Sequence, residues 1–151
     1  MNYKDIFDDQ NMMRELLLDH YQNPHNHGLV DNNRYTSKHM ASASCIDDIT
    51  IQLDVDNDII KDIRFDGVAC TISTASTSMM SDLLIGKNLN EAKHIINEYM
   101  KMINNEEYDF DLLEEANAFK NVYKQANRIK CATIGWDGIS ELINEKENGN
   151  G

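Results

Sequence analysis

The chain has 151 residues, of which 41% are hydrophobic and 7% aromatic, so it has the length of one domain and the composition of a folded protein. Its formal net charge is −12, with 14 Lys plus Arg against 26 Asp plus Glu, which disfavours binding to nucleic acid or anionic lipid and favours a cationic protein partner. No signal-peptide pattern opens the chain and no apolar run approaches the ~20 residues of a membrane span, so we expect a cytoplasmic protein with reduced thiols.

The first half of the chain is expected to form one helix followed by a small sheet. Apolar residues recur near one helical face over residues 6–21, and this helix should end at Asn23-Pro24, because proline disfavours α geometry in the residue before it. Apolar and polar residues then alternate, which predicts strands over residues 49–55 and 59–65 around a turn. A weaker third strand is expected within residues 34–43.

The second half of the chain has a helical period, which the acidic segment 104–111 breaks. It predicts helices from the apolar stripes at residues 72–83, 89–103, 112–126 and 132–143, with a frayed tail from residue 144 to residue 151. Strands precede helices without βαβ alternation, which favours an α+β fold with a small antiparallel three-stranded sheet and helices packed on one face. With no linker or repeat in view, residues 1–151 are expected to form a single domain.

The three cysteines occupy positions that suit chemistry. Cys45 and Asp47 are two residues apart, so in extended backbone their side chains point to the same face. Cys70 and Cys131 each open a predicted helix, whose N-terminal partial positive charge favours a thiolate. Three thiolates and one carboxylate would suit Zn²⁺ or sulfur chemistry. The cysteines are far apart in sequence, however, and the alternative that they are ordinary small buried side chains stays open.

A few other polar and aromatic residues are candidates for binding or packing roles. His25 and His27 lie in a polar segment and could chelate a metal, although such pairs are usually solvated, and His20 is expected to pack or hydrogen-bond. Trp136 is expected in the core, where it would anchor the last helix over the site. Arg128, a cation close to Cys131 in a strongly acidic chain, is the candidate for contact with a protein partner.

Three segments of the chain resemble the U-type iron–sulfur cluster assembly proteins, the IscU and NifU N-terminal-like family. Residues 18–28 are similar to the DHYxNPRNxG segment of that family, and residues 66–80 to its GxGCxISxASxSMM stretch. Residues 128–133 match the RIKCAT segment of the SufU branch, which is distinguished by a longer stretch before the third cysteine and by lysine, here Lys130, next to it. The resemblance therefore favours the SufU branch.

The resemblance implies an IscU-like domain with a metal site and a sulfur-transfer role. Carried over position by position, it implies that Zn²⁺ is held by Cys45, Asp47, Cys70 and Cys131. It further implies that Cys45 is the catalytic residue, which accepts persulfide sulfur from a SufS-type cysteine desulfurase and passes it toward cluster assembly proteins. Two alternatives remain: a scaffold on which a [2Fe–2S] cluster is built on the same ligands, and a non-catalytic zinc-stabilised interaction module.

The chain departs from the family pattern at two positions. Ile46 stands where the family has glycine between the first cysteine and the aspartate. A β-branched residue resists positive φ and close backbone approach, so we expect this loop to be shaped differently or to be less mobile. His25 stands where the family commonly has arginine, which is expected to weaken a partner contact.

Overall fold

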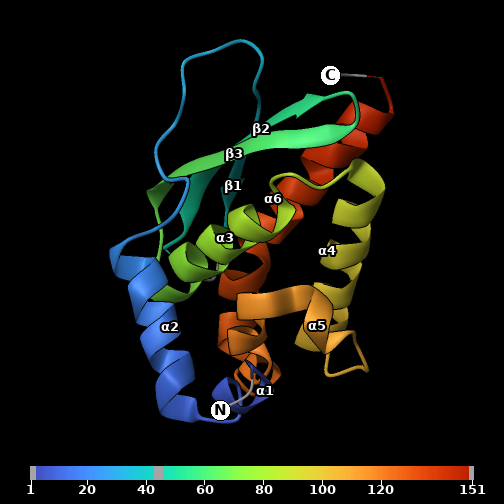
Figure 1. Ribbon diagram of the computed structural model, residues 1–151. Helices are drawn as coiled ribbons and strands as arrows, with labels where there is room; N and C mark the ends of the chain where they lie inside the picture. The colour runs from blue at the N-terminus through green and yellow to red at the C-terminus, as the bar shows by residue number, and fades with distance from the viewer. Residues whose placement is uncertain (1–2, 43–45, 150–151) are drawn as a thin grey trace.

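A three-stranded antiparallel sheet with helices packed on one face forms the fold (Figure 1). The computed structural model describes residues 3–42 and 46–149. The strands lie in the order β1 (Thr36–Ala41), β2 (Asp48–Asp56), β3 (Ile59–Val68). The predicted α+β class and all three predicted strands are confirmed.

Alternation of apolar and polar residues gives the sheet one buried face. Ile51 lies opposite Phe65, and Leu53 opposite Ile63, and all four side chains are buried. Residues 57 and 58 of the β2–β3 turn both have positive φ, of 53° and 63°, as a two-residue hairpin turn requires. The sheet thus presents an apolar surface on which helices can pack.

Four longer helices build the rest of the core, with short helices between them. The longer helices are α2 (Gln10–Gln22), α3 (Thr71–Leu84), α4 (Leu89–Ile103) and α6 (Ile129–Glu147). The short α-helices are α1 (Tyr3–Ile6) and α5 (Phe110–Leu113). Helices α3 and α6 pack against each other and against the sheet, while α2 packs on α3 and α4 on α6 (Figure 1). Among the described residues, none of the helices combines the length and the hydropathy that a membrane-spanning segment needs.

A buried polar cluster fixes α6 against α3 and α4. The Trp136 ring stacks on the Tyr99 ring, with centroids 3.8 Å apart, and Trp136 Nε1 donates a hydrogen bond of 3.0 Å to Ser76 Oγ. Tyr99 Oη donates to the carbonyl of Ala132 at 2.7 Å. Burial raises the pKa of Tyr99, so its phenol stays a hydrogen-bond donor. The prediction that Trp136 anchors the last helix in the core is confirmed.

Two helices end or break earlier than the apolar pattern predicts. The helix expected over residues 6–21 is divided, because the Asp9 side chain accepts from the backbone N–H of Asn11 at 2.9 Å and caps a new helix, α2. The helix expected over residues 112–126 is wrong: this segment forms α5 and 3₁₀ turns. There the Asn117 amide donates to the carbonyls of Phe110 and Glu114, at 2.8 and 2.9 Å, and so competes with helical bonding.

The last helix is longer than the sequence pattern predicts. Helix α6 includes residues 144–147, which the sequence assigns to a frayed tail. Lys93 of α4 contributes to this, because its Nζ lies 2.7 Å from Glu147 Oε2.

Replacing Gly67 by alanine is expected to destabilise the protein by about 3 kcal/mol. Gly67 has φ +132°, and an added Cβ would meet the carbonyl oxygen of Asp48 and lie 2.9 Å from Ile49 Cα. Gly86→Ala is the matched control, since Gly86 also has positive φ, +92°, but open space around its Cβ position, and should cost only about 1 kcal/mol. Denaturant unfolding of both variants measures the difference. Equal losses would contradict the close approach of β2 and β3 at this point.

Candidate functional site

Three side chains from distant parts of the chain converge at one end of the sheet. Asp47 directly precedes β2, Cys70 is the N-cap of α3, and Cys131 lies in the first turn of α6. One ligand atom of each lies within 4.8 Å of the others. The structure thus brings together three of the four metal ligands that the sequence resemblance implies.

Hydrogen bonds hold the Asp47 carboxylate in place. It is almost fully buried, and its Oδ1 accepts from the backbone N–H of Cys70 at 2.8 Å. Its Oδ2 accepts from Ser73 Oγ and lies 4.0 Å from Cys70 Sγ. A buried carboxylate satisfied in this way is oriented for a cation and stays beside the sulfur.

Both described thiols lie at helix N-termini. Cys70 Sγ accepts from the backbone N–H of Ser73 at 3.5 Å in the first turn of α3, and it is partly exposed, whereas Cys131 is buried. The positive end of a helix dipole stabilises negative charge, so each position suits a thiolate. Solvent or a partner can reach the site from the side of Cys70.

Cys45, the predicted catalytic residue and fourth ligand, lies outside the described residues. Ser42 and Asp47 lie before and after this segment, and the backbone N–H of Ser42 donates to the Asp47 carbonyl at 3.1 Å. Both ends of the segment therefore lie beside the site. The next residue, Ile46, has a side chain that is 67% exposed. Arg128 is also exposed, at the N-cap of α6, and its contact with a partner stays a prediction.

The donor set of this site fits a thiophilic divalent cation. Two thiolates and a carboxylate are ligands that Zn²⁺ prefers, with metal–ligand distances of about 2.0–2.3 Å. Ligand atoms around such an ion lie about 4 Å apart or less, and the three atoms here lie within 4.8 Å of one another.

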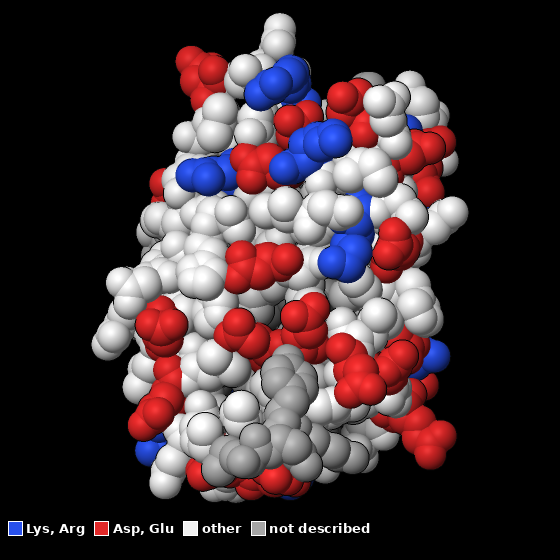
Figure 2. Space-filling view, viewed as in Figure 1, with Lys and Arg blue, Asp and Glu red and all other residues white. Residues whose placement is uncertain are grey.

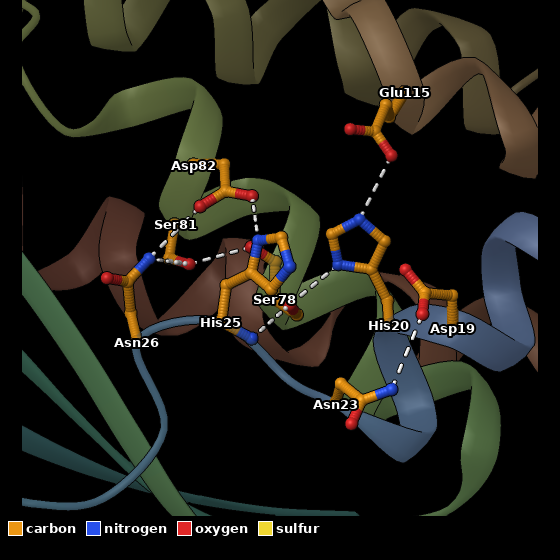
Figure 3. Close-up of polar contacts among 9 residues, drawn as sticks. All are labelled: Asp19, His20, Asn23, His25, Asn26, Ser78, Ser81, Asp82 and Glu115. Atoms are coloured by element: carbon orange, nitrogen blue, oxygen red, sulfur yellow. Dashed lines mark hydrogen bonds and ion pairs between the residues drawn. The ribbon is translucent and has the colours of Figure 1, made fainter.

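A second polar group joins the end of α2 to α3 and was only partly expected (Figure 3). His25 and His27 do not converge on one point: His25 Nδ1 lies 2.5 Å from Asp82, while His27 Nε2 lies 3.1 Å from Asp66. His20 is buried and hydrogen-bonded, as expected. The sequence carried no local signal for Asp82, which reaches this group through tertiary packing alone.

Known proteins resemble this chain over most of its length. Residues 12–140 match the model of the NifU-like N-terminal domain. The chain is 34% identical over 140 residues to the zinc-dependent sulfurtransferase SufU of Bacillus subtilis (strain 168), covering 92% of this chain and 94% of that protein.

Two further relatives give the same picture. The chain is 37% identical over 134 residues to the iron–sulfur cluster assembly scaffold protein IscU of Streptococcus pyogenes serotype M1, covering 88% of this chain and 83% of that protein. A crystal structure described as a hypothetical protein superposes with a TM-score of 0.83 at 35% identity, covering 90% of this chain and 99% of that one. The chain therefore belongs to the NifU-like N-terminal domain family, as its sequence motifs indicated.

Proposed function

We propose that this chain is a zinc-dependent sulfur acceptor, which takes persulfide sulfur from a cysteine desulfurase and passes it to iron–sulfur cluster assembly. The observation that carries the proposal is the convergence of Asp47, Cys70 and Cys131 at one point, with their ligand atoms within 4.8 Å of one another. Similarity to a protein named as a zinc-dependent sulfurtransferase, across 92% of the chain, supports it.

Four residues would hold the zinc ion: Cys45, Asp47, Cys70 and Cys131. Cys45 is two residues from Asp47 in the chain, which keeps its side chain within reach of the same ion. When bound, zinc keeps the thiols deprotonated and protects them from oxidation. Asp47 is the only oxygen ligand of the four, and the hydrogen bond from the Cys70 N–H orients it.

Sulfur transfer to Cys45 needs no oxidant or reductant. The Cys45 thiolate attacks the outer sulfur of the persulfide on the desulfurase, and a new sulfur–sulfur bond forms on Cys45. The sulfur–sulfur bond of the desulfurase persulfide breaks, and its cysteine leaves as a thiolate. Cys45 then carries the persulfide that a downstream assembly protein would receive.

The surface charge favours a cationic docking patch on a SufS-type desulfurase. The chain carries a net charge of −12, and Figure 2 shows acidic side chains spread over much of one face, while most visible Lys and Arg gather toward the sheet. Opposite charge would speed the encounter of the two proteins. Arg128 beside the site would make a specific contact, and both proteins would work in the cytoplasm.

Assembly of a [2Fe–2S] cluster on the same ligands is the second candidate function. It is favoured by the 37% identity to a protein named as an iron–sulfur cluster assembly scaffold. Thiolates and a carboxylate can hold iron as well as zinc. In that case the cluster would be the cargo of the protein.

Desulfurase turnover measured with and without this chain tests the proposal. A sulfur acceptor is expected to accelerate alanine formation from cysteine, and to be purified in air as a colourless protein with about one zinc per chain at the thiolate site. A scaffold would instead be brown and contain iron and acid-labile sulfide. A zinc-containing chain that leaves turnover unchanged would contradict the acceptor role and favour an interaction module.

A further inference from the structure

We propose that His20, His25, Asp82 and Glu115 form a second binding site, for a divalent transition-metal ion of the Zn²⁺ or Co²⁺ type. This site does not depend on the proposed function. It lies apart from the thiolate site. Both histidines are hydrogen-bonded to Ser78 Oγ, and Ser78 is about two turns beyond Cys70 in α3, or about 12 Å along the helix axis.

Imidazole and carboxylate donors from three elements converge here. One ligand atom each of His20, His25 and Asp82 lies within 4.8 Å of the others, and the two imidazole rings lie side by side with centroids 4.5 Å apart (Figure 3). His20 Nε2 lies 3.0 Å from Glu115 Oε2, which adds a second carboxylate. Two imidazoles and two carboxylates are a donor set that suits zinc, cobalt or ferrous iron.

Hydrogen bonds from neighbouring residues orient these side chains for an ion. Ser78 Oγ lies 2.7 Å from His20 Nδ1 and accepts from the His25 backbone N–H at 2.8 Å. A hydrogen bond at Nδ1 leaves Nε2 of His20 to bind a metal, as is usual for metal-bound histidine. The Asn26 amide donates to Asp82 Oδ1 at 3.2 Å, and Asp82 Oδ2 in turn lies 2.5 Å from His25 Nδ1.

Charge and access also suit a cation. A pocket of about 50 Å³ between α3 and the following 3₁₀ segment is lined by Asp82, Glu114 and Glu115 together with two apolar side chains. Neither histidine lines this pocket, so it borders the group on its carboxylate side only. His20 is buried, whereas His25 and Asp82 have side chains 45% and 41% exposed. An ion can therefore enter from solvent onto a fixed ligand.

The site would clamp three segments that are distant in sequence. His20 lies in the last turn of α2 and His25 in the segment that follows this helix. Asp82 is on α3, and Glu115 is on the 3₁₀ turn η1 (Glu114–Phe119). Without an ion, the His20 Nε2–H donates to Glu115. Hydrogen bonds alone then join the same segments. A hydrogen-bonded network that binds no metal is thus the competing interpretation.

Titration of the purified full chain with Co²⁺, after loading with one equivalent of zinc, tests the site. Wild-type protein is expected to bind one Co²⁺ with ligand-field bands but without the sulfur-to-cobalt charge-transfer band that a thiolate site would give. His25→Ala and Asp82→Asn should each weaken this binding by about tenfold or more. His27→Ala is the matched control, since His27 lies in the same segment and also pairs with an aspartate, Asp66, and it should bind Co²⁺ as the wild type does.

Histidine ring signals in ¹H–¹⁵N spectra give a second readout on wild-type protein. Addition of Co²⁺ should change the ring signals of His20 and His25 before those of the other histidines. Absence of any cobalt binding beyond the thiolate site would overturn the proposal, and so would equal affinity in the His25→Ala and wild-type proteins. Zinc content at the thiolate site is measured in the same samples, so failure of the proposed function would be seen separately.

Discussion

The Cys45→Ala variant is expected to accept no sulfur from the desulfurase. The proposed reaction requires a thiolate at Cys45, because Cys131 is buried and Cys70 is held by hydrogen bonds at the start of α3. Loss of the nucleophile removes the bond-forming step itself, so stimulation of desulfurase turnover should be lost completely. Mass spectrometry after incubation with desulfurase and cysteine would find one added sulfur on wild-type protein and none on the variant.

Cys45→Ser is the matched control for folding and metal binding. Serine keeps the size and an oxygen donor near Asp47 but is a poor nucleophile toward a persulfide. Because a serine hydroxyl is a weaker zinc ligand than a thiolate, this variant should melt below the wild type but not below Cys45→Ala, and it should still accept no sulfur. Persulfide on Cys70 or Cys131 of the Cys45→Ala variant, with turnover stimulated as in the parent, would assign the acceptor role to another cysteine.

Removal of zinc with a strong chelator is expected to lower the melting temperature markedly. Zinc at a structural site contributes folding free energy on the order of 10 kcal/mol near neutral pH, and less in acid because its ligands become protonated. Here the ion would join the start of β2 to the first turns of α3 and α6, at the buried side chains of Asp47 and Cys131. Scanning calorimetry with and without chelator, at neutral and acidic pH, measures the effect.

Asp47→Ala supplies the comparison for this experiment. The variant lacks a ligand that the hydrogen bond from the Cys70 N–H orients, so it should hold zinc more weakly, and chelator should shift its melt less than that of the wild type. A melt of wild-type protein that chelator leaves unchanged would show that these residues do not bind a structural metal ion.

Most of the sheet and the longer helices could be predicted from the sequence, because their signals are local. Alternation through Ile49, Ile51 and Leu53 marks a strand whose one face is buried. The helical period over residues 89–103 predicts α4 with both ends correct. In contrast, the apolar stripe over residues 112–126 failed, because the Asn117 side chain bonds to backbone carbonyls and replaces helical hydrogen bonds.

The thiolate site was predictable only with the help of the family resemblance. Helix N-termini before residues 72 and 132 indicated that Cys70 and Cys131 suit thiolates, but spacing alone could not place them beside Asp47. Close packing of α3 against α6 makes this approach possible, since both helices begin at the same end of the core. The histidine group was harder to foresee, because Glu115 reaches His20 across 95 residues of sequence.

X-ray absorption spectroscopy at the zinc edge, on natively purified chain, tests the ligand assignment most directly. Three sulfur atoms at about 2.3 Å and one oxygen at about 2.0 Å are the expected first coordination sphere, for the three cysteines and Asp47. Protein purified without zinc, or zinc surrounded only by nitrogen and oxygen, would contradict the account.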